Sequence, residues 1–321
     1  MSAAAAIDPA QSRESGNPAP KDWVPAGACT RAGQRPDPGA GTGGHERPFA
    51  ADLGAIRRLA NLLPGRRPLA VNGIRVAASI RSRKFVIEGG DDTPVTMPRT
   101  AFQVVYADGT VMIDSGLDKE THDSFSTPDK REPYFPDQFA KLRRALDDAR
   151  TIVLSHFHAD HIAGVTQAGN FIELAAKTVV AVDTARLMVD NPHRPHLKLA
   201  PEQAARFVIL DFPQYYPVAP GMVLIKARGH SPDHQMVYIA LESGREILHG
   251  VDVGWVLDNI REIKGKAAPW VKEDVPAVMG QLRWLNHILR HEPNITLLVT
   301  HDGAAFNAAV ESGTIGGELK L

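Results

Sequence analysis

The feature that most constrains this chain is the segment SHFHADHIAG, residues 155–164, which directly follows the apolar run TIVL. It brings three imidazoles and one carboxylate, from His156, His158, Asp160 and His161, into a single loop at the end of a predicted strand. Neutral imidazole and carboxylate groups are ligands that zinc and related divalent ions prefer. The segment therefore predicts a metal site, and further ligands must come from elsewhere in the chain because one loop cannot complete two sites.

Three further candidate ligands each follow an apolar run that is typical of a strand. His230 comes after MVLIKARG, Asp252 after EILHGV, and His301 after ITLLVT. Side chains that follow the ends of neighbouring strands can meet at one rim of a sheet sandwich. The sequence thus predicts that these three side chains converge with the histidine-rich loop.

The motifs HFHADH, GHSPDHQ, HGVD and VTHD, in this order, resemble those of the metallo-β-lactamase superfamily of metal-dependent hydrolases. The similarity runs from about residue 70 to the C-terminus, and the motifs are closest to the lactonase and glyoxalase II-like branches. Asp114, followed by Ser-Gly, resembles the aspartate that this superfamily carries upstream of its main motif. The resemblance implies an α/β fold, a four-layer αββα sandwich with two metal ions at its edge.

The resemblance also implies a role for each motif residue. One metal ion would be held by His156, His158 and His230, the other by Asp160, His161 and His301, and Asp252 would bridge them. Asp160 would also be the catalytic residue that accepts and passes on a proton. Asp114 and His234 would lie behind the ligands, with Asp114 fixing the tautomer of a ligand imidazole. The expected cofactors are two divalent ions, zinc first, with iron, manganese or cobalt as alternatives.

The reaction that this set implies is hydrolysis of a small ester or lactone by a metal-bridging hydroxide, as in acyl-homoserine lactonases. The alternatives are hydrolysis of a phosphodiester, sulfate ester or thioester, β-lactamase-like activity, an iron-dependent redox protein, and a binding module without catalysis. Two positions depart from the lactonases: Trp255 stands where they commonly carry a tyrosine, and Asp233 where they carry a glycine. The predicted substrate contacts are Trp255, His193 and His196.

Three segments are predicted along the chain. Residues 1–50 are rich in Pro, Gly and Ala and are expected to be a disordered tail. Residues 51–69 are expected to be a short helix and a linker, and residues 70–321 the catalytic domain.

Within these segments, short β-rich runs and helical periodicity predict a layered α/β arrangement with mixed sheets. Strands are expected at 73–80, 84–89, 102–107, 110–116, 151–155, 178–182, 222–227, 235–241, 246–252 and 295–300. Helices are expected at 51–63, 136–148, 171–177 and 272–291. The proline-rich residues 184–222 are expected to be an irregular excursion over the site.

Composition narrows the class of partner. The 321 residues carry a net charge of −1, so no basic surface for nucleic acid is expected. No apolar run approaches the roughly 20 residues that span a bilayer. The N-terminus has no standard signal peptide, so cytoplasm is the default location. The expected partner is a small-molecule substrate, and the sequence carries no signal for oligomeric state.

Overall fold

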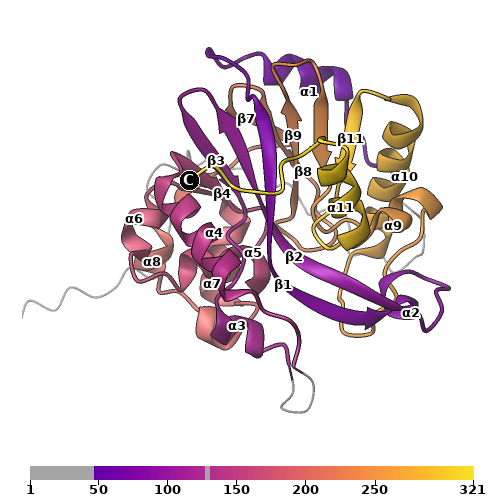
Figure 1. Cartoon of the computed structure of the whole chain (residues 1–321), viewed down its shortest axis with the longest axis horizontal. Helices are drawn as coiled ribbons and strands as arrows, with labels where there is room; N and C mark the ends of the chain where they lie inside the picture. The colour runs from indigo at the N-terminus through magenta and orange to yellow at the C-terminus, as the bar shows by residue number, and fades with distance from the viewer. Residues whose placement is uncertain (1–46, 127–130) are drawn as a thin grey trace, which may run out of the picture.

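The computed structural model of the chain describes residues 47–126 and 131–321, so the tail predicted at 1–50 lies almost entirely outside the described residues. Two β-sheets form the centre of the molecule (Figure 1). The first contains β1 (Ala70–Ser82), β2 (Pro94–Tyr106), β3 (Gly109–Ile113), β4 (Thr151–Val153), β5 (Thr178–Ala181) and β6 (Val208–Leu210), in that order. The second has the order β11 (Ile295–Leu298), β10 (Glu246–His249), β9 (Gln235–Ala240), β8 (Met222–Lys226) and β7 (Tyr215–Ala219).

Both sheets are mixed, as the sequence predicts. In the first sheet β1, β2 and β3 pair antiparallel, and pairing is parallel from β3 to β6. In the second sheet β10 and β11 pair in parallel and the remaining pairs are antiparallel. A turn at residues 107–109 joins β2 to β3, and Gly109 has a φ of 155°.

Helices cover the outer face of each sheet, which gives four layers (Figure 1). The first sheet carries α4 (Pro136–Asp148), α5 (Ala159–Thr166), α6 (Phe171–Ala175) and α7 (Val182–Asp190), with α3 (Lys119–Asp123) and α8 (Pro201–Ala204) beside them. The second sheet carries α1 (Leu53–Ala60), α9 (Leu257–Glu262) and α10 (Val275–His291). The helix α11 (Gly303–Glu311) follows β11 and packs on β2.

Three apolar layers hold the sandwich together. The layer between the sheets is formed by side chains that include Val104, Ile113, Leu224, Ile239 and Leu298. A second layer lies between the first sheet and its helices, and a third packs α1, α9 and α10 against the second sheet. Burial of apolar surface on both faces of each sheet is the main stabilising term for such a fold. The predicted αββα sandwich is confirmed.

The strand predicted at 84–89 is wrong. These residues lie at the far end of the long β1–β2 hairpin, where α2 (Arg83–Val86) reverses the chain. The Lys84 amide donates to Asp91 O across this turn. Val86 is buried against Met97 and Trp255 in a small apolar cluster, so its burial does not require sheet pairing.

The prediction of an irregular segment at 184–222 is also wrong for most of that range. It contains most of α7, a 3₁₀ turn at Pro195–Leu197, α8, β6 and β7. Pro195 and Pro201 stand at the first position of a helix or turn, where the backbone needs no N–H donor. Pro217 lies in β7, an edge strand that tolerates proline.

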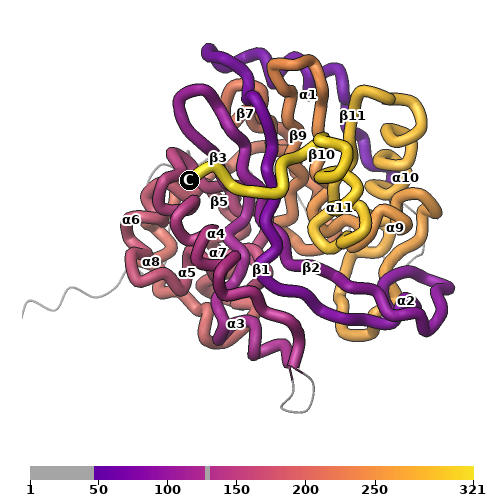
Figure 2. The backbone as a smooth tube through the Cα atoms, viewed as in Figure 1, coloured from indigo at the N-terminus to yellow at the C-terminus, as the bar shows by residue number. Residues whose placement is uncertain are grey.

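The C-terminal segment is hydrogen-bonded to β1 and β2 of the first sheet. Figure 2 shows it crossing β1 and β2 after α11. The Gly73 amide donates to Gly316 O at 2.9 Å. The Gln103 side-chain amide donates to Lys320 O and accepts from the Lys320 amide. Across residues 47–126 and 131–321, no helix has both the length and the apolar character needed to cross a membrane.

Candidate metal centre

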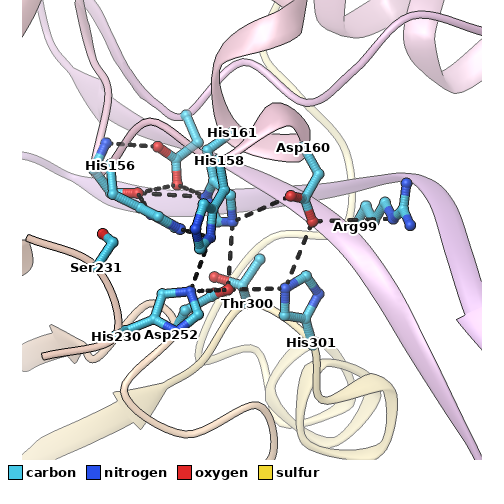
Figure 3. Close-up of polar contacts among 12 residues, drawn as sticks. Arg99, His156, His158, Asp160, His161, His230, Ser231, Asp252, Thr300 and His301 are labelled. Carbon is cyan, nitrogen blue, oxygen red and sulfur yellow. Dashed lines mark hydrogen bonds and ion pairs between the residues drawn. The ribbon is translucent and has the colours of Figure 1, made fainter. Parts of the chain in front are cut away.

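Seven side chains meet at one edge of the sandwich (Figure 3). Each stands shortly after the end of a strand: the histidine-rich loop follows β4, Asp252 follows β10 and His301 follows β11. His230 lies in the turn between β8 and β9. Their potential ligand atoms form two groups, each within 4.8 Å: His156, His158, His230 and Asp252, and Asp160, His161 and His301. The structure therefore brings together all seven residues that the sequence singles out as ligands.

The first group is a cluster of imidazoles. The Nδ1 atom of His158 lies 3.0 Å from His156 Nε2 and 3.0 Å from His230 Nε2. Burial, followed by the neighbouring imidazoles, holds the pKa of His156 and His158 well below the ordinary value. These two rings are therefore neutral near pH 7, and a neutral imidazole has the free lone pair that a metal requires.

One oxygen atom of Asp252 joins the two groups. Its Oδ2 lies 3.4 Å from His230 Nε2 in the first group. It also lies 3.2 Å from His301 Nε2 and 3.6 Å from His161 Nε2 in the second group. A carboxylate oxygen in this position can serve ions on both sides.

The second group combines imidazole and carboxylate. Asp160 Oδ2 lies 3.7 Å from His301 Nε2, and Asp160 Oδ1 lies 4.0 Å from His161 Nε2. Burial raises the pKa of Asp160, but His161, Arg99 and His301 outweigh it and hold that pKa at about 2. Burial lowers the pKa of His161, but three surrounding carboxylates raise it well above the ordinary value. This concentration of buried negative charge calls for a cation.

Two unsatisfied atoms point to the same need. His161 Nε2 and Asp252 Oδ1 are buried and have no hydrogen-bond partner among the described residues. Buried polar atoms in folded proteins are nearly always hydrogen-bonded or bound to an ion, because an unpartnered one is costly. The donor set of nitrogen and carboxylate oxygen atoms fits divalent zinc, iron, manganese or cobalt.

Asp114 lies directly behind His161. Its Oδ2 is 2.8 Å from His161 Nδ1, and the carboxylate also accepts from the amide and hydroxyl of Ser155 at 2.8 and 2.9 Å. Because Nδ1 donates to Asp114, Nε2, which faces the cluster, is the ring nitrogen available to an ion. Asp114 is held in a left-handed backbone conformation with a φ of 62°.

His234 is saturated by the backbone. Its Nδ1 lies 3.1 Å from Ala227 O, and its Nε2 accepts from the Asp252 amide at 3.2 Å. With both ring nitrogens occupied, His234 has no lone pair for a metal. It lies behind the candidate ligands and holds the backbone amide of Asp252.

The sequence did not indicate the buried pair Glu273 and Lys266. Glu273 accepts from His230 Nδ1 and from Lys266 Nζ, and the Lys266 ammonium also donates to Asp252 O. The side chains of Lys266 and Glu273 are only 1% and 5% exposed. Lys266 and Glu273 contact His230 but lie 36 and 43 positions after it in the sequence. No local sequence pattern marks residues that meet over such separations.

A cavity of about 970 Å³ opens above the centre. Its apolar part includes Met97, Phe157 and Trp255, and exposed Trp270 stands at its rim. Of the three predicted substrate contacts, Trp255 and His193 line this cavity. His196 does not line it, and its Nε2 lies instead 3.0 Å from Thr121 Oγ1.

Comparison with known proteins identifies related chains. The model of the metallo-beta-lactamase superfamily matches residues 96–250, a range that ends just before Asp252. An N-acyl homoserine lactonase of Bacillus thuringiensis is 24% identical over 156 residues, which are 49% of this chain and 57% of the lactonase. The chain thus matches less than two thirds of the length of that curated relative.

Solved structures of low sequence identity share the fold. A quorum-quenching N-acyl homoserine lactone lactonase has a TM-score of 0.61 at 16% identity, covering 79% of this chain and 99% of the other. An N-acyl homoserine lactone hydrolase with N-hexanoyl-L-homoserine bound at its catalytic metal centre has a TM-score of 0.59 at 17% identity, covering 75% and 96%. The four-layer sandwich of this chain is therefore one found in known hydrolases.

Proposed function

Because this chain belongs to the metallo-β-lactamase superfamily, we propose that it is a dinuclear metal-dependent hydrolase that cleaves a small ester or lactone. The observation that carries the proposal is the position of Asp252 Oδ2, within 3.2 to 3.6 Å of imidazole nitrogens from both ligand groups. A single carboxylate oxygen between two sets of imidazoles is suited to bind two ions at once. A site for one ion would not need a carboxylate shared by both sets.

The residues proposed to hold the ions are those of the two groups. His156, His158 and His230 would hold one, Asp160, His161 and His301 the other, and Asp252 both. Zinc is the first choice for this ligand set, with iron, manganese and cobalt also compatible. Two such ions would supply a hydroxide nucleophile near neutral pH and polarise the carbonyl oxygen of the substrate.

The chain itself would supply proton transfer through Asp160. This side chain is 13% exposed and lines the cavity, unlike the fully buried His161. With a pKa of about 2, its carboxylate is ionised at any pH at which such an enzyme works. It is therefore placed to accept a proton from the attacking water and deliver it to the alkoxide that leaves.

The cavity favours a small substrate with an apolar part. Aromatic and apolar side chains line much of its wall, and an acyl chain or ring would bury surface there. Relatives named as N-acyl homoserine lactonases support a lactone as the first class to test. Residues 70–321 would form the catalytic domain, to which α1 adds Ile56 and Ala60 on the outer face of the second sheet.

A parallel substrate panel tests this function. Full-length, zinc-loaded protein is assayed on acyl-homoserine lactones, aryl esters, a thioester and a phosphodiester, and bound metal is measured by elemental analysis. We expect two ions per chain and turnover of esters or lactones. The Asp160→Asn variant should lose more than about a hundred-fold in kcat while it stays folded. Asp190→Asn, at an exposed position on α7, is the matched control. No turnover of any ester or lactone by protein with two bound ions would exclude the proposal.

A further inference from the structure

Two arginines occupy one wall of the cavity without a full set of partners. Arg99, on β2, is 4% exposed and lines the cavity. Its Nη1 is buried and has no hydrogen-bond acceptor among the described residues. Arg194, which follows α7, also lines the cavity, and its Nε is likewise buried without an acceptor.

Both guanidinium groups pack on the same aromatic ring. The Cζ atoms of Arg99 and Arg194 each lie 4.1 Å from the centroid of the Phe125 ring. Packing on an aromatic face fixes the plane of a guanidinium and leaves its N–H groups directed outward from its edge. Phe125 thus holds two positive charges in fixed orientations on one wall.

Carboxylates near these arginines are already engaged. Glu132 lies 4.0 Å from Arg99, but it is paired with Arg81 and accepts from Ser79. Asp160 lies 3.9 Å from Arg99 Nε, and in the proposed function its oxygens bind a metal ion and transfer protons. Within residues 47–126 and 131–321, no carboxylate lies within ion-pair distance of Arg194, and Asp160 acts on its charge only from further away.

His193 adds a hydrogen-bond donor to this wall. Its Nδ1 accepts from the Ala159 amide at 2.9 Å, so its ring proton is on Nε2. An N–H donor next to two guanidinium groups favours a ligand that brings only acceptors.

From this arrangement we propose that the substrate carries a carboxylate in addition to its scissile ester or lactone bond, and that Arg194, with Arg99, binds this carboxylate. The planar fork of a guanidinium matches a carboxylate with two parallel hydrogen bonds. In a partly buried cavity such a pair is screened little by salt. The proposal rests on the proposed function for the position of the scissile bond, whereas binding of the carboxylate can be measured separately.

Matched esters test the preference. Hydrolysis of 3- and 4-acetoxybenzoate adds water across the acetyl C–O bond and gives acetate and the hydroxybenzoate, and the corresponding acetoxybenzamides differ only in charge. We expect the wild-type kcat/KM to be at least ten-fold higher for an acetoxybenzoate than for its amide. Arg194→Met should reduce this ratio about ten-fold or more, and Arg194→Lys should retain part of it. Arg186→Met, at a position 61% exposed on α7, is the control and should leave the ratio unchanged.

Calorimetry provides a readout without turnover. Full-length, zinc-loaded protein is titrated with 4-hydroxybenzoate and with 4-hydroxybenzamide. We expect 4-hydroxybenzoate to bind more tightly, and Arg194→Met to lose that difference while Arg186→Met keeps it. If the two ligands bind the wild type equally, or if Arg194→Met leaves their difference intact, the inference is overturned. The calorimetry decides on the carboxylate site whether or not these esters are turned over, whereas the proposed function fails only if no ester or lactone is hydrolysed.

Discussion

Replacing Asp114 by asparagine tests the assignment of His161 as a metal ligand, because the exchange changes which ring nitrogen of His161 carries the proton. Asp114 Oδ2 holds the proton of His161 on Nδ1, which leaves Nε2 free to face the ligand cluster. In Asp114→Asn, the Asn oxygen can still accept from the Ser155 amide, and the NH₂ group then faces His161 Nδ1. Because an NH₂ group requires an acceptor, the proton of His161 moves to Nε2, and the ring loses its free lone pair on the metal side. Asparagine also tolerates the left-handed backbone at this position, where φ is 62°, so the turn itself should persist.

The expected size of this effect follows from the role of a residue that orients a ligand. Loss of such a partner weakens metal binding about 10- to 100-fold, which corresponds to roughly 1.4 to 2.7 kcal/mol. The site with Asp160, His161 and His301 should be affected most, because Asp114 reaches the other group only through the Ser155 hydroxyl, which lies 3.0 Å from His156 Nδ1. At limiting zinc, the variant should therefore bind close to one ion per chain where the wild type binds two.

Zinc titration against a competing chelator, with elemental analysis after gel filtration, measures this effect. Asp108→Asn is the matched control, since Asp108 is 76% exposed and pairs only with Arg150 at the surface. Two ions of unchanged affinity in Asp114→Asn would refute the assignment of His161 as a ligand. Circular dichroism measures whether the variant still unfolds cooperatively. Loss of both ions together with loss of cooperative unfolding would show that Asp114 is needed for folding and does not act on His161 alone.

Two further predictions concern buried charges near the centre. Glu273→Gln should weaken zinc binding at the His230 group about 10- to 100-fold. It would also leave the Lys266 ammonium buried without its carboxylate partner, which should lower the free energy of unfolding by roughly 3 kcal/mol. The double variant with Lys266→Met should regain most of the stability without regaining the affinity, as urea unfolding and zinc titration can show. Burial raises the pKa of Asp233 from 3.8 to about 6, so the folded state binds more protons than the unfolded chain between these two values. The contribution of Asp233 to stability is thus present below about pH 4, is lost as pH rises to about 6, and amounts to some 3 kcal/mol. The free energy of unfolding of Asp233→Asn, relative to wild type, should therefore increase from pH 4 to pH 7; a difference independent of pH would contradict this.

The parts of the site that could be predicted from sequence share a local cause. His156, His158, Asp160 and His161 lie in one loop after a strand, so a short spacing places them together whatever the rest of the chain does. His230, Asp252 and His301 were recognisable because each follows an apolar strand-like run, and neighbouring strands end at one edge of a sheet. The β-rich run at 84–89 shows the limit of the same reasoning. The strand-forming side chains there lie at the turn of the β1–β2 hairpin, and Val86 is buried against Trp255, a contact with a distant loop that no local pattern reveals.

Residues whose function depends on distant partners left no pattern in the sequence. His193 and His196 look equivalent in NPHRPHLK, but Pro195 starts a 3₁₀ turn between them and directs only His193 to the cavity. Arg99 and Arg194 are 95 positions apart and are related only through the ring of Phe125. The proposed metal ligands, which would decide which bonds can be activated, are positioned by strand ends. The side chains proposed to bind the substrate come from the β1–β2 hairpin and from the loops after α3 and α7, which the sandwich core does not constrain. Substrate choice can therefore change in this fold while the metal centre remains intact.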